Sequence, residues 1–378
     1  MSIRTLSFFM VGVILIIIVF IALFAFVFPI QKRALTEQFT ACEKSYNDGK
    51  YQEAVNLLET FIKKHPGSKK TSDAYYYLAM SKQKLGDNAG AMDLWGKIIK
   101  KYPKSKNIAE AHYYLGYGYE NDKQYDQAEE RYTAIVKNYL DVPITAGAML
   151  GLGRIYEMKG QESEAIASFQ NVVDKYPDSE FIKEAEQRLG SINLNKFLKD
   201  NTKTYTVKKG DNLVTIARNF HTTPELIIRL SDLKSHSMNI GQTLKILDGS
   251  GLNVLIDLTK CKLFLKSGDS IIKRYYVCVG KKETPTPSGS YNVIEKMVNP
   301  TWFSDSQTGG LGEVPGGDPR NELGTRWIGF KPSFGVHGTI FSDSIGKAES
   351  HGCVRMNKED VEELYDLVTT VTPIKIVP

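Results

Sequence analysis

Residues 36–198 repeat a pattern of small and large apolar positions every 37 residues. Two amphipathic segments of helical length, separated by a short turn, fit within each unit. This period predicts a stack of helical hairpins in which each unit buries the face of its neighbour. The repeating columns are Ala54, Ala91, Ala128 and Ala165; Leu58, Trp95, Tyr132 and Phe169; Ala74, Ala111, Ala148 and Ala185; and Leu78, Leu115, Leu152 and Leu189.

The second helix of several units ends at a proline, as in Lys-His-Pro at 64–66 and Lys-Tyr-Pro at 101–103. The pattern predicts four hairpins and a terminal helix from about residue 181 to 198. It resembles tetratricopeptide (TPR) repeats, which commonly present a concave surface to a protein partner; that partner is unknown. Cys42 falls in a column of small residues and His65 in a column of tyrosines, so we expect packing or helix-end roles for both.

Residues 5–31 contain no charged side chain, and residues 6–30 are almost wholly apolar. A helix over these 25 residues rises about 37 Å, more than the roughly 30 Å hydrocarbon layer of a membrane. The run lacks the small residues of a signal-peptide cleavage site. The sequence therefore predicts an uncleaved transmembrane signal-anchor helix over 5–31. Basic residues flank both ends, so charge does not decide its orientation.

The composition excludes several classes of function. The formal net charge is +5, with lysines and carboxylates interspersed, and no basic tract indicates nucleic-acid binding. Four cysteines at irregular spacing form neither a zinc pattern nor a dense disulfide framework. The glycine-rich stretch 300–325 lacks the Gly-Lys-Ser/Thr ending of a phosphate-binding loop, which argues against nucleotide binding.

A thiol and an imidazole lie in glycine-rich surroundings near the C-terminal end. Residues 350–357 read Ser-His-Gly-Cys-Val-Arg-Met-Asn, and residues 335–339 read Gly-Val-His-Gly-Thr. A thiol reacts as a thiolate, so Cys353 needs a base, which His337 supplies if adjoining strand ends bring the two together. Neighbouring glycines let backbone amides approach a reacting carbonyl. The pattern predicts acyl transfer through a thioester rather than a buried structural cysteine.

These motifs resemble the signature of the L,D-transpeptidase family with a YkuD-type catalytic domain, and the resemblance covers about residues 252–378. Gly280, Thr-Pro-Thr-Pro-Ser-Gly at 284–289 and Leu-Gly-Thr-Arg-Trp-Ile-Gly at 323–329 match as well. The resemblance implies a cysteine-dependent enzyme that cross-links peptidoglycan stem peptides and needs no metal or organic cofactor.

The resemblance also implies roles for individual residues. The carbonyl of Gly338 would orient the His337 imidazole. The backbone amides of Gly352 and Cys353 would line an oxyanion hole, with His351 nearby.

Three further motif residues carry less specific expectations. Ser350 belongs to the matched site. Arg355 either binds a substrate carboxylate or pins the loop. Asn357 precedes acidic residues and an apolar helical face, so we expect it at the N-cap of a helix.

The C-terminal domain should be mostly β, because its segments are rich in β-branched and aliphatic residues. Cys261 and Cys278 fall on neighbouring predicted strands; a disulfide is conceivable, but free thiols are the preferred interpretation. Family resemblance assigns the irregular stretch 300–325 to a mobile substrate lid. The predicted strands are 253–257, 262–266, 271–279, 291–295 and 327–330.

Residues 203–247 predict a strand, two short helices and a returning strand. The order and residues resemble a LysM domain, whose family binds glycans that contain N-acetylglucosamine. The resemblance places a shallow glycan groove at two turns, although the same residues fit purely structural turn roles. These residues are Gly210, Asp211, Asn212, Leu213, Asn239 and Ile240. Residues 248–251 (Asp-Gly-Ser-Gly) read as a short flexible joint.

Taken together, the sequence predicts a multidomain chain: an anchor helix, an all-α TPR-like solenoid, a βααβ LysM module and a mostly-β catalytic domain. The expected function is a membrane-anchored L,D-transpeptidase, with the bulk of the chain in the periplasm or cell-wall space of a bacterium. Two alternatives remain open. Water as the acceptor would make the enzyme an L,D-carboxypeptidase or endopeptidase, and an inactive site would leave a wall-binding scaffold.

Overall fold

The structure, a computed structural model of the chain, describes residues 32–303 and 312–378. The anchor helix expected at 5–31 therefore lies outside the described residues. In the two described ranges, no helix is both long enough and apolar enough to cross a membrane. The chain divides into two compact units, Met1–Val172 and Val173–Pro378.

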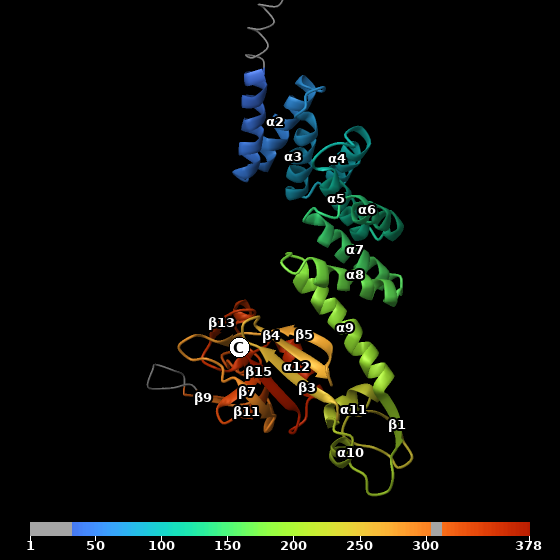
Figure 1. Cartoon of the computed structure of the whole chain (residues 1–378), viewed down its shortest axis with the longest axis vertical. Helices are drawn as coiled ribbons and strands as arrows, with labels where there is room; N and C mark the ends of the chain where they lie inside the picture. The colour runs from blue at the N-terminus through green and yellow to red at the C-terminus, as the bar shows by residue number, and fades with distance from the viewer. Residues whose placement is uncertain (1–31, 304–311) are drawn as a thin grey trace, which may run out of the picture. The chain divides into compact units, whose positions relative to one another are not determined.

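The first unit is a series of helices joined by short turns (Figure 1). Consecutive helices from α2 to α7 contact each other. The four predicted hairpins are present as four successive pairs of helices. These are a helix over 32–47 with α2 (Tyr51–Lys64), α3 (Thr71–Lys84) with α4 (Asn88–Lys101), α5 (Ile108–Asn121) with α6 (Tyr125–Asn138), and α7 (Ile144–Met158) with α8 (Glu162–Lys175).

The repeating columns form the core of this solenoid. The alanines of the first column are at most 3% exposed, and Leu58 and its equivalents at most 1%. Close approach explains why some positions must be small: a Cβ atom at Gly151 would collide with the ring of Tyr132, and one at Gly153 with the ring of Phe169. Cys42 is buried in the same core, as expected.

The tyrosine column that contains His65 marks the ends of helices. His65, Tyr102 and Tyr139 occupy the C-cap positions of α2, α4 and α6, where each backbone N–H closes the last helical turn. The His65 imidazole also bonds the Gln38 side chain at 3.0 Å. The predicted helix-end role of His65 is confirmed.

The second unit begins at the end of the solenoid with α9 (Ile182–Asn201) and continues into the βααβ module. Its strands pair antiparallel, from Thr202↔Leu247 to Thr206↔Thr243. Thr223 caps the second helix and Pro224 lies in its first turn. The module comprises β1 (Thr202–Thr206), α10 (Leu213–Asn219), α11 (Pro224–Leu230) and β2 (Thr243–Leu247).

Two sheets form most of the C-terminal domain. One has the strand order β5-β4-β3-β15-β7 and the other β14-β12-β11-β8. The mostly-β prediction is confirmed. The strands of the first sheet are β3 (Leu252–Asp257), β4 (Lys262–Ser267), β5 (Ser270–Tyr276), β7 (Gly289–Asn292) and β15 (Pro373–Val377). Those of the second are β8 (Glu295–Val298), β11 (Arg326–Lys331), β12 (Phe334–His337) and β14 (Val354–Arg355).

The strand predicted over 291–295 is wrong in one respect, because the chain changes sheets within it. β7 ends at Asn292 and β8 begins at Glu295. Between them, the N–H of Val293 donates to Thr372 and that of Ile294 donates to Gly329, so the two residues bond to different sheets.

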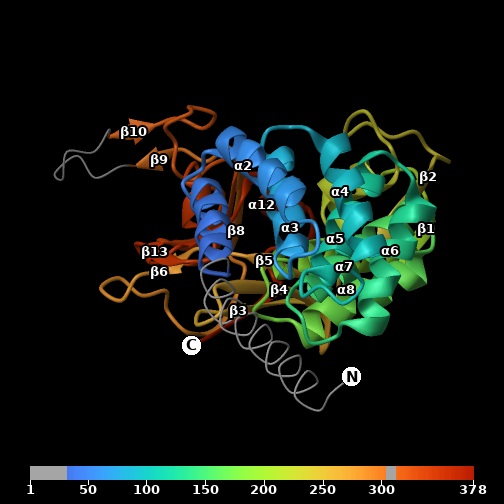
Figure 2. The same cartoon turned by 90° about the horizontal axis from the view of Figure 1, so that it is seen from above.

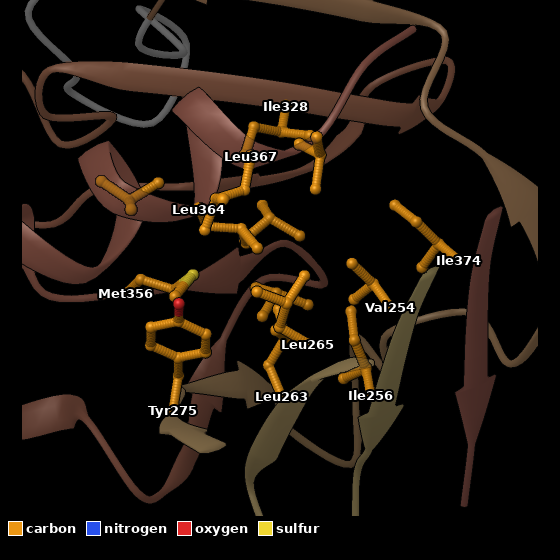
Figure 3. Close-up of a cluster of buried hydrophobic side chains, with 14 of the residues drawn as sticks. Val254, Ile256, Leu263, Leu265, Tyr275, Ile328, Met356, Leu364, Leu367 and Ile374 are labelled. Carbon is orange, nitrogen blue, oxygen red and sulfur yellow. The ribbon is translucent and has the colours of Figure 1, made fainter. Parts of the chain in front are cut away.

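One apolar core joins the five-stranded sheet, β11 and α12 (Lys358–Leu367) (Figure 3). Val254 and Leu265 extend into it from the sheet, Ile328 from β11 and Leu364 from the helix. Asn357 occupies the N-cap position of α12, as predicted, and two acidic residues follow in its first turn, although the Asn357 side chain makes no capping hydrogen bond.

Within the second unit, α9 and the βααβ module pack on the C-terminal domain. Leu194, Leu226 and Leu247 join the same core, and α9 runs beside β5 (Figure 1).

The flexible joint predicted at 248–251 is wrong: the N–H of Gly249 donates to Phe220, and a Cβ there would collide with a backbone carbonyl.

Candidate active site

The pairing of β12 with β14 brings the two functional segments together. The strands are parallel, with Val336 opposite Val354 and His337 opposite Arg355. Side chains alternate along strands, so extending this alternation by one residue before β14 puts Cys353 on the same face as His337, opposite the buried valines. One strand spacing and two residues of rise separate their Cα atoms by roughly 8 Å. Side chains of this length can bridge that separation.

The His337 ring is buried and held on two sides. Its residue is 4% exposed, its Nδ1 lies 2.6 Å from the carbonyl oxygen of Gly338, and its ring stacks on Trp327 at 5.7 Å. A carbonyl accepts only, so Nδ1 carries the hydrogen and Nε2 remains an acceptor. Burial, with a smaller contribution from Arg355, lowers the pKa of His337 to about 4, against the raising effect of backbone hydrogen bonds with Gly338 and Leu323. The imidazole is therefore neutral at physiological pH.

The Cys353 thiol is also neutral at rest. It is partly exposed and lies 3.7 Å from the carbonyl of Ser333. Burial raises the pKa of Cys353, against smaller lowering effects from the Gly335 amide and Arg355. A neutral thiol and a neutral imidazole suit deprotonation by a general base during attack rather than a preformed ion pair. The Gly335 amide is a feature that the sequence analysis missed.

Ser350 holds the nucleophile loop from inside. It is buried; its hydroxyl donates to the carbonyl of Cys353 at 2.5 Å and accepts from the N–H of Gly352 at 3.2 Å. Gly352 has a φ of +113°, and a Cβ there would lie 2.8 Å from the Phe334 ring. These contacts explain why the motif needs serine and glycine at these positions.

The expected oxyanion role of Gly352 is not available in this conformation, because its N–H already donates to Ser350. The amide of Cys353 lies just outside β14. The oxyanion role of the Cys353 amide stays a prediction.

His351 lies at the exposed rim of the site. Its Nε2 lies 3.5 Å from the Nζ of Lys281, whose own backbone N–H donates to the carbonyl of Ser350. Sequence reasoning did not single out Lys281, although it directly follows the matched Gly280. Together these residues make the rim basic.

Arg355 contacts protein groups rather than an open site. Its guanidinium lies 3.8 Å from a carboxylate oxygen of Glu322 and 5.5 Å from the ring centre of Phe341. Of the two expected roles, these contacts favour pinning the loop.

The four cysteines are free thiols in the structure, so a Cys261–Cys278 disulfide is absent from the described chain. Cys278 exchanges backbone hydrogen bonds with Arg355 at 2.9 and 2.8 Å. It therefore supports the nucleophile loop through its main chain.

No group of three or more potential metal ligands comes together within residues 32–303 and 312–378.

The stretch predicted as a lid lies partly outside the described residues, namely 304–311. Its two described arms, β9 (Trp302–Phe303) and β10 (Glu313–Val314), pair antiparallel beside the C-terminal domain (Figure 2). The buried side-chain amide of Asn321 donates to the Pro300 carbonyl at 2.8 Å and ties the ends of the stretch together. Lid motion stays a prediction.

The first predicted glycan turn, 210–213, is shaped by its own contacts. Gly210 has a φ of +90°. Asp211 accepts from the Tyr205 hydroxyl and from the Lys208 N–H. Asn212 caps α10, and Leu213 is buried in the module's core.

The second turn lies at the same end of the module, because Gly241 and Gln242 bond to the backbone of Val207. The N–H of Asn239 donates to Gln242. Ile240, by contrast, is 71% exposed. Its side chain lies outside the buried core of the module.

Comparisons with known proteins agree with this organisation. The family model of the L,D-transpeptidase catalytic domain (YkuD) matches residues 253–376, and the LysM domain model matches residues 205–247. The YfiO model, described as an outer membrane lipoprotein, matches residues 31–218.

Two curated relatives match the C-terminal half. The "Putative L,D-transpeptidase YkuD" of Bacillus licheniformis is 32% identical over 181 residues, 46% of this chain and 98% of that protein. The protein of the same name from Bacillus subtilis is 30% identical over 182 residues, with the same coverage of 46% and 98%. The solved structure of an L,D-transpeptidase from Mycobacterium smegmatis is 22% identical, covers 37% of this chain and 65% of that one, and has a TM-score of 0.29.

These matches place the chain among the enzymes that act on peptidoglycan. It belongs to the L,D-transpeptidase family, and it carries a LysM domain and TPR-like repeats of the YfiO type before its YkuD catalytic domain.

Proposed function

We propose that Cys353 attacks the carbonyl carbon of the third residue of a peptidoglycan stem tetrapeptide and expels the terminal D-alanine. One observation carries the proposal: His337 is fixed through Nδ1 to the Gly338 carbonyl, on a strand that pairs with the residues directly after Cys353. This arrangement leaves Nε2 as the proton acceptor for the thiol.

The proton moves between two groups that are both neutral at rest. The Cys353 S–H proton passes to Nε2 of His337 as the sulfur bonds the carbonyl carbon. The C–N bond to D-alanine then breaks, and the imidazolium returns the proton to the leaving amine. The low pKa of the buried His337 makes its imidazolium a strong acid for this second transfer.

The tetrahedral oxyanion would accept a hydrogen bond from the N–H of Cys353. Loss of one such donor typically costs roughly 10²–10³ in rate. The ammonium of Lys281 beside His351 adds positive charge at the same rim.

An amine from a neighbouring stem then attacks the thioester, forms an amide between two third-position residues and frees the thiol. Water in place of the amine would give the L,D-carboxypeptidase or endopeptidase reaction. Product masses from defined tetrapeptide dimers distinguish the acceptors, because hydrolysis yields tripeptides and transfer yields cross-linked products.

The other regions would hold this site against the wall. The proposed anchor fixes the chain to the cytoplasmic membrane, with its bulk in the periplasm or cell-wall space. The LysM module would bind glycan strands, and the repeats an unidentified protein. Tethering of this kind raises the effective concentration of substrate.

The test is acylation of the full chain by a carbapenem, to which members of the resembled family are generally sensitive, followed by intact mass. We expect one adduct on the wild type and on the control Cys42→Ala, and none on Cys353→Ala. Cross-linking should disappear with the adduct. Acylation that persists in Cys353→Ala would remove this residue from its role.

A scaffold function is the competing outcome. A chain that binds wall glycan but shows neither acylation nor product formation, with an unreactive Cys353 thiol in alkylation assays, would support it.

A further inference from the structure

A second cavity lies between the LysM module and the catalytic domain, both within the second unit. Its volume is about 590 Å³, within the usual range of ligand sites. From the module it is lined by α10, α11 and the turn between them. From the catalytic domain it is lined by Lys296 on β8 and by residues 369–371. It shares no lining residue with the active site described above.

Thr222 supplies an unused polar group in the cavity wall. The residue is 5% exposed, and its hydroxyl has no hydrogen-bond partner in the described part of the chain. Its neighbour Thr223 is fully used, since its hydroxyl bonds the carbonyl of Asp366 and the N–H of Leu226. A buried polar group without a partner costs about 1–3 kcal/mol. The Thr222 oxygen is shielded from solvent in this conformation, so a ligand recovers the cost when the side chain rotates towards the cavity.

Lys296 supplies a second polar group in the cavity wall. Its ammonium donates to the carbonyls of Tyr365 and Val368 at 2.7 and 2.8 Å, and it lies 3.9 Å from the Tyr365 ring centre. An ammonium has three N–H donors, so one remains after these two bonds. Burial lowers the pKa of Lys296 to about 8, although Glu225 and Asp366 act in the opposite direction. A further anion in the cavity would offset the remaining penalty.

The remaining lining limits the chemistry of the ligand. Arg218 adds a permanent positive charge to that of Lys296, whereas Glu225 supplies a negative one. Between the charged groups lie the small apolar side chains of Val214, Ala217 and Val371. A site with both signs of charge and an apolar wall complements a short zwitterionic peptide with small side chains. A neutral sugar can form hydrogen bonds with these groups but supplies no counter-charge for them.

We propose that this cavity binds a short peptide that bears both a carboxylate and an ammonium group. The carboxylate bonds Thr222 and Lys296, and the ammonium pairs with Glu225. The identification of the peptide as a wall stem with a third-position diamine rests on the proposed function. Such a site holds a second stem, acceptor or product, beside the glycan module.

The test uses full-length Cys353→Ala protein with labelled alanine and valine methyl groups, so that no peptide is consumed. The probe is a synthetic stem tetrapeptide with a third-position diamine. The Ala217 and Val371 methyl signals report the cavity, and the Val354 signal, next to position 353, reports the active site. We expect saturable shifts of the cavity signals with the peptide, at least fivefold weaker binding of its C-terminal amide, and no shift with an N-acetylglucosamine oligomer.

Two variants locate the binding on the protein. Thr222→Val and Arg218→Gln should each weaken the cavity shifts severalfold. Thr215→Val, the same substitution on α10 at an exposed position outside the cavity lining, should change nothing. The amidated peptide tests the carboxylate contact even if a variant misfolds.

Each result decides between the proposals. Absent cavity shifts, equal shifts with sodium acetate, or shifts unaffected by both variants would overturn the second site. Shifts at Val354 alone would leave the proposed active site standing without the cavity. Shifts at Ala217 and Val371 alone would support the cavity while the active-site proposal fails.

Discussion

The nucleophile loop and the LysM turns both carry family motifs, but the fold uses those motifs differently. In the loop, buried Ser350 and Gly352 support a neighbour, and the chemistry is left to Cys353 and His337. In the turns, the side chains of Asp211 and Asn212 accept hydrogen bonds from nearby backbone N–H groups and so stabilise the turn itself.

The difference follows from the sizes of the catalytic domain and the LysM module. The catalytic domain has two sheets and a large core to hold its loops, so motif residues there are free to form a site. The LysM module has two short strands and two helices of seven residues each, and its own turn residues must stabilise it. A motif match therefore indicates a functional site in the catalytic domain, whereas in the LysM module it mainly indicates the fold.

The largest expected effect concerns His337. The folded-state pKa of His337 is lowered to about 4 from its usual 6.5, so the neutral base is present above pH 4 and is lost as pH falls through that value. Carbapenem acylation should therefore be independent of His337 protonation from pH 5 to 8 and fall about tenfold per unit below pH 4. His337→Gln should lower the rate roughly 10²–10⁴-fold and remove this acid limb.

Circular dichroism at each pH separates catalysis from unfolding. Such a control is needed because the unfolded chain protonates this histidine near pH 6.5, so stability declines as pH falls from there towards 4. An inflection in rate near pH 6.5 without structural change would contradict the assigned environment of His337.

Local periodicity and motif spacing predicted much of this organisation. The alanine column beginning at Ala54 predicted the solenoid core, and glycine-flanked His337 and Cys353 predicted adjoining strand ends. Such features are local or repeat at a fixed step, so the sequence alone displays them.

Contacts between distant segments were not predictable in this way. Lys281 meets His351 across 70 positions, and Glu186 of α9 receives bonds from Lys262 and Tyr276. Nor does the spacing of the motif residues reveal that the Ser350 hydroxyl accepts a hydrogen bond from the Gly352 amide. These contacts depend on how whole helices and strands pack together. That packing overrides the structural preferences of individual residues.

Ser350→Ala tests the loop half of the comparison. The change removes a buried hydroxyl and leaves the Cys353 carbonyl and Gly352 amide without their partner. We expect a loss of about 1–3 kcal/mol in the free energy of unfolding, together with slower acylation. Urea denaturation and acylation rates measure both. Ser342→Ala, also near the site but on the 3-10 turn Ser342–Ser344, is the control; equal behaviour of the two variants would refute the supporting role.

Asn212→Ala tests the LysM half. Its side chain accepts from the N–H of Thr215 at 2.9 Å and caps α10. Removing the cap should cost about 1 kcal/mol of stability, whereas Asn212→Ser should restore most of it. If binding of an N-acetylglucosamine oligomer is lost in both variants while stability is unchanged, Asn212 contacts the glycan and its role as a cap is secondary.

The smallest effect should come from Ile240, whose side chain is exposed and outside the module's buried core. Ile240→Ser should leave the unfolding free energy within about 0.5 kcal/mol of wild type and weaken glycan-oligomer binding severalfold, measured by calorimetry. The matched control is Ile294→Ser, an exposed isoleucine in the catalytic domain and outside the lining of the second cavity. Loss of binding in Ile240→Ser alone would show that this module uses residues between its structural turn positions for recognition. Unchanged binding would move the glycan surface away from these two turns.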